Sequence, residues 1–352
     1  MTIKTDPRFE KITIFLKNIG LENAVIKPLA GDASFRRYDR ILDKAKPKNP
    51  KNYILMDAPP PQEDVRPFIA IANHLNDMGF SAPKIHNSHI NMGFLLLEDL
   101  GDLTYNEALK LNPNLENKLY KNAIDCLVKL QCQPIKRDLI IEQKEIFKIG
   151  AYNSTTLFKE FNLLIDWYLP EVLKNNTLDH KSRTRGILEG KFDELTPFLD
   201  TFVLRDYHAD NLMHLGDRKG HSQVGLLDFQ DALIGHKAYD LVSLLEDARR
   251  DVSPQLESAM INRFLKGHGE NGNTLDKEQF LSHYHLLGAQ RNAKIIGIFT
   301  RLLRRDGKSQ FLSLIPRVLR LFERNLEHPS LKGLKTWFDE TLPPERRGVP
   351  SE

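Results

Sequence analysis

Three polar residues in one short stretch have the types and the spacing that phosphoryl transfer requires. Asp206 and Asn211 stand five positions apart, and Asp228 follows seventeen positions after Asn211. Transfer from a nucleotide needs a carboxylate near the attacking hydroxyl and oxygen ligands for Mg²⁺. The spacing therefore predicts that Asp206 accepts or orients the substrate hydroxyl, and that Asn211 and Asp228 hold the metal.

Each of these residues also has an ordinary structural explanation. Asp206 and Asn211 are residue types that form turns, and Asp228 could cap a helix. The apolar runs 201–204 and 224–227 lead directly into the two acids, however, as strands that end at a functional loop would. The combined pattern favours catalytic and metal-binding roles for these residues over purely structural roles in turns or caps.

The elements before residue 98 predict a small sheet with helices. Apolar residues recur at helical spacing in the first helix, and short extended segments separated by turns follow it. The expected elements are a helix at 8–19, strands at 24–29, 35–42, 52–57 and 93–98, and a helix around 68–75 that Gly79 closes. The first three of these strands are expected to form an antiparallel meander.

From residue 104 onward helical periodicity dominates the chain. The expected helices are 104–111, 115–132, 155–174, 183–198, 237–249, 254–268, 276–305, 309–327 and 329–339. The predicted fold class is α+β, with an N-lobe at 1–98, a C-lobe at 99–342 and a loose tail at 343–352. Clefts between lobes commonly bind ligands, and we expect the ligands there.

Composition narrows the possible partners. The chain has 352 residues with 50 basic and 47 acidic side chains, so general binding to nucleic acid is not indicated. No apolar run approaches the roughly 20 residues that span a bilayer, and the N-terminus lacks a signal peptide. No zinc-binding pattern accompanies Cys126 and Cys132, so we expect both to be free thiols. We expect a cytoplasmic protein without membrane insertion or an obligate protein partner.

The stretch around these acids resembles the catalytic and metal loops of the protein-kinase-like fold, in the aminoglycoside and choline phosphotransferase branch. Asp206 and Asn211 match its Asp-x4-Asn loop, and the segment 227–232 is similar to its Asp-Phe-Gly element. A register through Asp210 would need Asn at position 215, which is Leu. The resemblance implies a bilobal fold, with a small antiparallel-sheet N-lobe containing one internal helix and a large, mainly helical C-lobe. It also implies ATP and Mg²⁺ as cofactors.

The segment 31–38 resembles the loop that covers the nucleotide phosphates in this fold. Gly31, Ser34, Phe35 and Arg36 are the residues that the resemblance assigns to the nucleotide. Backbone N–H groups and the Ser34 hydroxyl could touch phosphate oxygens, although a plain turn would have the same composition.

The segment 96–100 resembles the hinge that meets the adenine, through backbone groups near Glu98 and Leu100. Met56 is also expected among the nucleotide-binding residues, but it departs from the general pattern, because kinases carry a phosphate-binding Lys at that position. Glu63 then lacks its usual partner. Either Arg36 or Arg37 replaces the missing cation, or the nucleotide is held mainly by Mg²⁺. Asp240 is expected to cap a helix or to brace the catalytic loop.

Five segments resemble more narrowly the bacterial sugar kinases that phosphorylate N-acetylmuramate and N-acetylglucosamine at C1 in cell-wall recycling. These segments are 31–38, 56–60, 205–213, 228–232 and 288–301. In this subfamily Met at position 56 would be typical. The resemblance makes a sugar the expected small-molecule substrate.

Side chains of the helix around 288–301 are candidates for substrate contact. Gln290, Arg291 and Lys294 lie on one side of that helix, and Arg291 or Lys294 could face a sugar carboxylate. His208 or Asp231 could bind sugar hydroxyls. A basic surface stripe is the alternative for this helix. Another acceptor (an aminoglycoside, choline or ethanolamine) and a non-catalytic nucleotide-binding scaffold remain alternatives for the whole protein.

Overall fold

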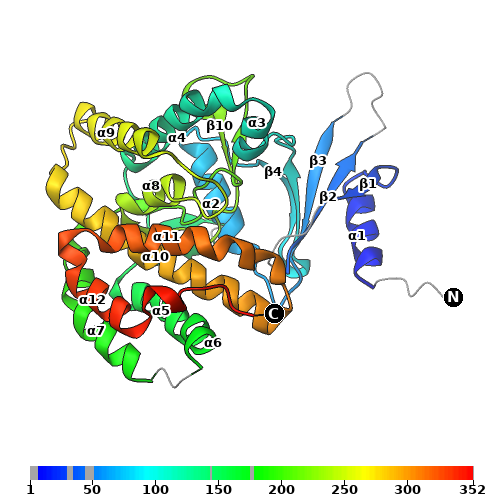
Figure 1. The fold of residues 1–352 in the computed structure, drawn as a ribbon. Helices are drawn as coiled ribbons and strands as arrows, with labels where there is room; N and C mark the ends of the chain where they lie inside the picture. Colours follow the sequence, from blue (N-terminus) through cyan, green and yellow to red (C-terminus); the bar gives the residue numbers. More distant parts are fainter. Residues whose placement is uncertain (1–6, 30–34, 44–50, 143–144, 175–177, 352) are drawn as a thin grey trace. The chain divides into compact units, whose positions relative to one another are not determined.

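The computed structural model describes residues 7–29, 35–43, 51–142, 145–174 and 178–351, and these form two compact units (Figure 1). The first unit comprises Met1–Tyr105, Asp138–Lys148 and Leu212–Asp231. The second unit comprises Asn106–Arg137, Ile149–Asn211 and Ala232–Glu352. Each unit therefore contains segments that are distant in sequence.

A five-stranded antiparallel sheet is the framework of the first unit. Its strands lie in the order β1-β2-β3-β5-β4. They are β1 (Val25–Pro28), β2 (Arg37–Leu42), β3 (Asn52–Asp57), β4 (Ile85–His89) and β5 (Phe94–Glu98). The turn into β5 requires glycine, because Gly93 has a φ of 70° and a Cβ there would meet the Ala58 carbonyl oxygen at 1.9 Å.

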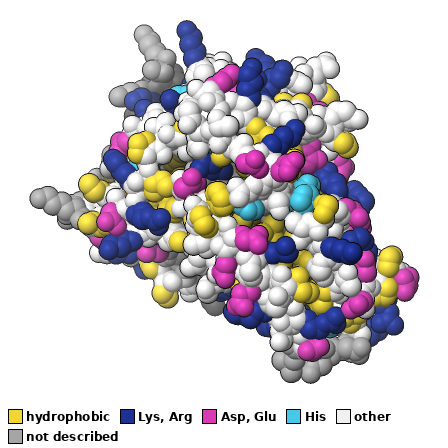
Figure 2. All heavy atoms as spheres, turned by 90° about the vertical axis from the view of Figure 1, so that its left-hand side faces the viewer, with side chains coloured by type: hydrophobic (Ala, Val, Ile, Leu, Met, Phe, Trp, Pro, Cys, Tyr) yellow, Lys and Arg dark blue, Asp and Glu magenta, His cyan; other side chains and the backbone are white. Residues whose placement is uncertain are grey.

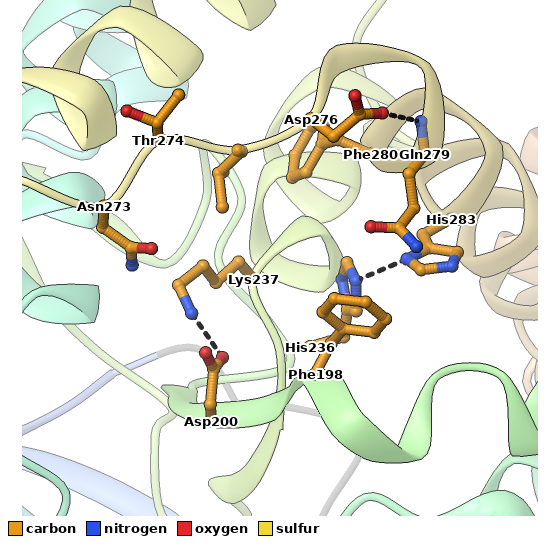
Figure 3. Close-up of a pocket in the computed structure, with 11 residues that line it drawn as sticks. Phe198, Asp200, His236, Lys237, Asn273, Thr274, Asp276, Gln279, Phe280 and His283 are labelled. Carbon is orange, nitrogen blue, oxygen red and sulfur yellow. Dashed lines mark hydrogen bonds and ion pairs between the residues drawn. The ribbon is translucent and has the colours of Figure 1, made fainter.

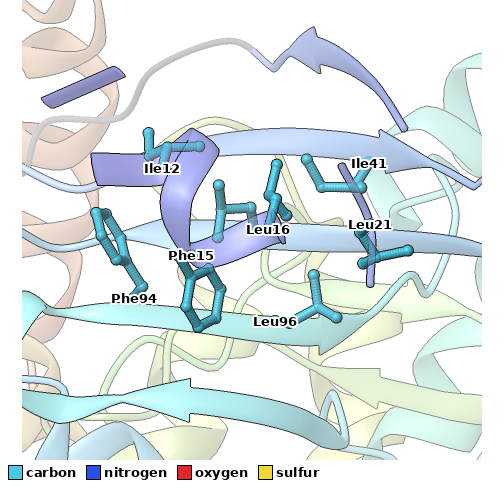
Figure 4. Close-up of a cluster of buried hydrophobic side chains, with 8 residues drawn as sticks. Ile12, Phe15, Leu16, Leu21, Ile41, Phe94 and Leu96 are labelled. Carbon is cyan, nitrogen blue, oxygen red and sulfur yellow. The ribbon is translucent and has the colours of Figure 1, made fainter. Parts of the chain in front are cut away.

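Helix α1 (Pro7–Asn18) packs on this sheet through the face that the sequence periodicity predicts. Ile12, Phe15 and Leu16 are buried against side chains from the strands, including Ile41 and Phe94 (Figure 4). The Phe15 and Phe94 ring centroids are 5.5 Å apart. This cluster is the hydrophobic core on one side of the sheet.

The remaining elements of the first unit include helix α2 and two hairpins. These elements are α2 (Arg66–Asp77), β6 (Asp138–Ile140) with β7 (Ile146–Lys148), and β9 (Leu212–His214) with β10 (Val224–Leu226). The β9–β10 hairpin joins the rest of the unit because the Leu226 N–H donates to the Ser81 carbonyl at 2.8 Å. Gly225 in this hairpin has no room for a side chain, since a Cβ would lie 2.7 Å from Met213.

The described part of the second unit is mainly helical. Its helices are α3 (Tyr105–Leu111, which begins at the last residue of the first unit), α4 (Glu116–Gln131), α5 (Ser154–Leu163), α6 (Leu169–Leu173), α7 (Leu178–Asp193), α8 (Ala238–Leu245), α9 (Pro254–Glu270), α10 (Lys277–Asp306), α11 (Ile315–Leu326) and α12 (Lys332–Thr341). One antiparallel pair, β8 (Leu199–Val203) with β11 (Leu233–His236), accompanies them.

Helix α10 approaches the end of α5 very closely. A Cβ at Gly297 would lie 2.2 Å from the Leu163 backbone carbon, so only glycine permits this approach. Directly after Leu163 the chain makes one π-helical turn, Leu164–Tyr168, and continues as α6. The close approach sets α5 and α10 side by side, and both helices carry residues of the site described below.

The final residues make specific contacts with the second unit. The Arg347 guanidinium pairs with Glu323 and Asp339, and the Tyr168 hydroxyl donates to the Gly348 carbonyl at 2.8 Å. In the described part of the chain, no helix combines the length and the apolar character that crossing a membrane would take. Figure 2 shows one face of the molecule, where basic and acidic side chains are interspersed.

Candidate functional site

The segment 204–211 of the second unit is held by a buried carboxylate. The strand β8 ends at Val203, and the next two backbone N–H groups, of Leu204 and Arg205, donate to Asp240 at 2.7 and 2.8 Å. Asp240 lies inside α8, so it does not cap that helix, but the predicted brace is confirmed. Burial raises the pKa of Asp240 to about 7, although the two N–H donors act in the opposite direction.

Strained backbone accompanies this loop. Arg205 has a φ of 72°, a left-handed conformation that is uncommon for residues other than glycine. Such strain persists where the surrounding structure enforces it, and it is frequent at functional sites. Here the Asp240 carboxylate provides that enforcement and fixes the direction in which the following residue, Asp206, leaves the backbone.

Asp206 is a half-buried carboxylate surrounded by cations. Burial alone would raise its pKa, but the charges of Lys294, His208 and Arg291 more than offset this, and the pKa of Asp206 lies below its ordinary value. The carboxylate is consequently ionised at neutral pH. An ionised carboxylate is the form needed to accept a proton from a hydroxyl.

Glu160 in α5 ties these cations together, and sequence reasoning did not find it. Its carboxylate accepts from the Lys294 ammonium and the Gln290 amide, both at 3.2 Å, and from the Arg205 guanidinium and the Tyr152 hydroxyl. Burial would raise the pKa of Glu160, but Lys294 and Arg205 lower it below the ordinary value. Glu160 therefore links Arg205 to helix α10.

The three candidate residues of α10 are all buried, so the alternative of a basic surface stripe is wrong. Lys294 is 8% exposed and is engaged by Glu160, while Gln290 donates to Glu160 and to the Leu157 carbonyl. Arg291 is 4% exposed, and its Nη1 has no hydrogen-bond partner among the residues that the structure describes. A buried donor without a partner is costly, and an anionic ligand would satisfy it.

Asn211 and His208 are connected to Asp206 through the loop itself. The Asn211 Nδ2 donates to the Asp206 carbonyl at 3.0 Å and lies 3.3 Å from the His208 Nε2, which then acts as the acceptor. Burial lowers the pKa of His208, and its Nδ1 is buried without a partner in the described structure. The amide oxygen of Asn211 is the atom that suits a metal.

Asp210, the residue of the rejected register, serves a different role. Its carboxylate accepts from the Asn106 amide at 2.7 Å and lies 3.3 Å from the Arg249 guanidinium. The neighbouring Ala209 N–H donates to Asp247 at 3.3 Å. These bonds attach the second half of the loop to its surroundings in the second unit.

In the first unit, Asp228 and Glu63 share one cation. The Arg36 guanidinium lies 3.5 Å from the Asp228 carboxylate and 3.5 Å from that of Glu63, while Arg37 pairs with Asp39 at 3.1 Å. Burial lowers the pKa of Arg36, but Tyr38, Asp228 and Glu63 raise it overall. Of the two candidates for the missing cation, the structure therefore places Arg36 at Glu63.

The structure describes the surroundings of three further candidate residues, Met56, Asp228 and Asp231. Met56 is buried in β3 and lies opposite Tyr38 of β2. Asp228 has a φ of 56° and accepts from the Gln230 amide at 2.9 Å, which also lies 3.4 Å from Asp231. Asp231 itself is exposed.

The predicted hinge and covering loop are only partly described. The Glu98 carboxylate pairs with Arg218 at 2.7 Å, and Leu100 lies beside Gly225 of the β9–β10 hairpin. Phe35 is 70% exposed, and its N–H donates to Glu63 at 3.2 Å. The positions predicted for phosphate contact at Gly31 and Ser34 lie outside the described residues.

The two residues predicted to hold Mg²⁺ are oxygen donors, and each unit contributes one of them to the list of candidates. Within the described ranges, no group of three or more His, Cys, Asp or Glu residues could hold a metal ion. The amide oxygen of Asn211 and the carboxylate of Asp228 are hard oxygen donors. Mg²⁺ is commonly held by one or two such groups together with substrate phosphates.

Comparison with known proteins identifies relatives along most of the chain. Residues 25–276 match the profile described as the phosphotransferase enzyme family. A protein of Caulobacter vibrioides named N-acetylmuramate/N-acetylglucosamine kinase is 32% identical over 99% of this chain and 100% of its own length. A protein of the same name from Pseudomonas aeruginosa is 36% identical, over 85% of this chain and 83% of its own length.

Solved structures with similar folds are small-molecule kinases. An ethanolamine kinase of Plasmodium vivax superposes with a TM-score of 0.61 at 14% identity, covering 92% of this chain and 90% of its own. The amicoumacin kinase hAmiN, solved with AMP-PNP, Ca²⁺ and Ami, has a TM-score of 0.59 at 15% identity, with 92% and 97% covered. At these identities the likeness establishes the fold, and the predicted protein-kinase-like class is confirmed.

Proposed function

We propose, because this chain belongs to the phosphotransferase enzyme family, that it is an ATP-dependent kinase of N-acetylmuramate, N-acetylglucosamine or both, and that it phosphorylates the anomeric C1 hydroxyl. Relatives over most of the chain are named as kinases of these two sugars. The observation that carries the proposal is the ionised Asp206 surrounded by Lys294 and by Arg291, whose Nη1 is buried without a partner in the described structure.

Asp206 is the group that handles the acceptor proton. The C1 hydroxyl donates a hydrogen bond to the Asp206 carboxylate, which orients the oxygen toward the γ-phosphorus of ATP. As the new O–P bond forms, the bond between the γ-phosphorus and the β,γ-bridging oxygen breaks, the hydroxyl proton passes to Asp206, and ADP leaves. Lys294 and Glu160 hold the carboxylate and its neighbours in place before the reaction.

Arg291 is the residue assigned to bind the carboxylate of an acidic sugar acceptor. Its buried Nη1 would pair with the lactyl carboxylate of N-acetylmuramate, which N-acetylglucosamine lacks. Gln290 and Lys294, also predicted to contact substrate, both bond to Glu160, and the charge of Lys294 lowers the pKa of Asp206. His208 and Asp231 are assigned to sugar hydroxyls.

The nucleotide side of the reaction is assigned to a separate set of residues. Asn211 and Asp228 would hold Mg²⁺, which neutralises phosphate charge when it is bound. Arg36 takes the place of the phosphate-binding Lys that Met56 replaces, and Gly31, Ser34, Phe35, Glu98 and Leu100 complete the nucleotide contacts. We assign the enzyme to the cytoplasm because it consumes ATP and has two free thiols.

An acceptor panel tests this function directly. The purified protein with ATP and Mg²⁺ is assayed by ADP release with N-acetylmuramate, N-acetylglucosamine, kanamycin and choline, and Asp206→Asn is the inactive control. We expect release with one or both N-acetyl sugars and none above background with the other two. Turnover of kanamycin or choline alone would refute the sugar assignment, and no turnover of any acceptor would favour a scaffold.

Substituting Arg36 tests the replacement of the missing lysine. Because a hydrogen bond to a charged group is worth roughly 1.5–3 kcal/mol, Arg36→Met should raise the KM for ATP about tenfold or more. The KM for the sugar should stay within about twofold of wild type, since no sugar contact is lost. Initial rates at varied ATP and fixed sugar measure the effect.

The matched control is Arg37→Met, the same change one residue along. Arg37 pairs with Asp39 and not with Glu63 or Asp228, so its loss should leave the KM for ATP nearly unchanged. Equal effects of the two substitutions would show that Arg36 has no special role at the nucleotide.

A further inference from the structure

A cavity of about 380 Å³ lies within the second unit, and none of its lining residues belongs to the predicted phosphotransfer site. Its walls come from the start of β8, the end of β11 and the segment that leads into α10 (Figure 3). The lining residues are Phe198, Asp200, His236, Lys237, Asn273, Thr274, Leu275, Asp276, Gln279, Phe280 and His283. Cavities of about 300–1,000 Å³ commonly bind small molecules.

One wall of this cavity is aromatic and uncharged. The Ala238 N–H donates to the His236 Nδ1, so the proton of His236 is on Nε2, which then donates to the His283 Nδ1 at 2.9 Å. Phe198 packs on both imidazoles, with ring centroids 5.1 Å from His283 and 5.9 Å from His236. Burial lowers the pKa of His236 to about 3, so this wall stays neutral.

This hydrogen bond also fixes the tautomer of His283, whose ring lies beside the apolar ring of Phe198. Because Nδ1 of His283 is the acceptor for His236, the proton of His283 is on Nε2. Amide and hydroxyl side chains of Asn273, Thr274 and Gln279 also line the cavity (Figure 3). A ring with one apolar face and hydroxylated edges matches such a surface.

The opposite side of the cavity carries a buried cation. Lys237 is 5% exposed, and its backbone carbonyl accepts from the Gln131 amide at 3.0 Å, which fixes its position. Its ammonium pairs with Asp200, whose side chain is 51% exposed (Figure 3). An ammonium has three donor hydrogens, and in the described structure Lys237 forms an ion pair with Asp200. Lys237 can therefore offer a further donor hydrogen to a ligand, while Asp276, the second carboxylate of the lining, accepts from the Gln279 N–H.

We propose that this cavity is a second ligand site, which takes an anionic monosaccharide, with the sugar ring on the Phe198–His236–His283 wall and its anionic group on Lys237. A sugar carboxylate and a sugar phosphate share this chemistry. The ring gains apolar contact with the aromatic wall and hydrogen bonds to Gln279 and Asn273, and the anion gains a charge-assisted bond in a partly desolvated place. The site is independent of the acceptor assigned to Asp206.

Binding of three probes tests the site. Ligand-observed NMR titrations with glucuronate, glucose 6-phosphate and neutral glucose are made on the full-length protein. We expect at least one of the two anionic probes to bind at millimolar or lower concentration, and glucose to bind about tenfold or more weakly because it lacks the bond to Lys237. The better of the two anions identifies the source as carboxylate or phosphate.

Two variants assign the binding to this cavity. Lys237→Met should weaken the anionic probe about tenfold or more, whereas Lys277→Met, an exposed lysine beside the cavity segment, should not. Thr274→Trp changes an exposed lining residue and should fill the opening, abolish probe binding and leave the kinase rate unchanged. If Lys237→Met does not fold, Thr274→Trp decides alone. Absence of binding by both anions, or binding unchanged in Thr274→Trp, would overturn the proposal.

Discussion

Asp206→Asn should lower kcat by about 10²–10⁴-fold while the KM for ATP stays close to that of wild type. The substitution keeps the shape of the side chain but removes the charge that accepts the hydroxyl proton. Because the carboxylate is ionised by the charges of Lys294, His208 and Arg291, its loss removes the base and not merely a binding contact. Steady-state rates with ATP and N-acetylglucosamine, and nucleotide binding followed by fluorescence, measure the two effects.

Asp210→Asn is the matched control for this prediction, because it makes the same change four residues along in the same loop. Asp210 bonds to Asn106 and lies near Arg249, so its replacement should cost stability more than catalysis, with kcat within about fivefold of wild type. An inactive Asp210→Asn beside an active Asp206→Asn would reverse the assignment and restore the rejected register.

Lys294→Met should move the acid limb of the kcat/KM profile to higher pH. In the wild type the pKa of Asp206 is below its ordinary value, so the carboxylate remains ionised as pH falls toward that value. Among the nearby charges, Lys294 lowers the pKa of Asp206 most, so its removal should raise that pKa. Its protonation, and the loss of activity, should then begin at a higher pH.

Lys294→Arg is the control, since it retains the charge near Glu160 and Asp206. Its acid limb should stay close to that of wild type even if its rate at neutral pH is lower. Thermal denaturation across the same pH range separates unfolding from titration. Coincident acid limbs for wild type and Lys294→Met would show that Lys294 does not set the ionisation of Asp206.

Local sequence signals predicted the long elements well. Helix α10 was expected at 276–305 and spans Lys277–Asp306, because Asp276 caps its start by accepting from the Gln279 N–H and Gly307 ends it with a φ of 66°. Strand β3 matches its predicted range of 52–57. These signals are contained in neighbouring residues and need no knowledge of the fold.

Elements that depend on distant partners were missed. Strand β4 has the sequence Ile85-His-Asn-Ser-His89, which has little β propensity, and it is a strand because it pairs with β5 at the edge of the sheet. Strands β6, β7 and β11 have three or four residues each, too few for a periodic pattern. The helix predicted at 155–174 is divided by the π-helical turn Leu164–Tyr168, which no residue pattern indicated.

The residues of the candidate site also fall into those that local sequence signals reveal and those that depend on distant contacts. Asp206 and Asn211 could be found because both lie in one loop at a fixed spacing, and Asp240 because it follows the loop closely in a recognisable helix start. Glu160 has no motif around it, and only the packing of α5 on α10 brings it to Lys294. The choice of Arg36 over Arg37 likewise depends on which guanidinium lies at Glu63, and only the folded position of the residue just before β2 decides that.

The position of the phosphate on the product tests the central claim most directly. N-acetylglucosamine is incubated with ATP, Mg²⁺ and the enzyme, and the sugar phosphate is examined by phosphorus NMR with coupling to the sugar protons. The account predicts one product in which phosphorus couples to the anomeric proton, and the Asp206→Asn variant should form almost none of it. A phosphate on any other ring hydroxyl, or wild-type amounts of product from the variant, would contradict the account.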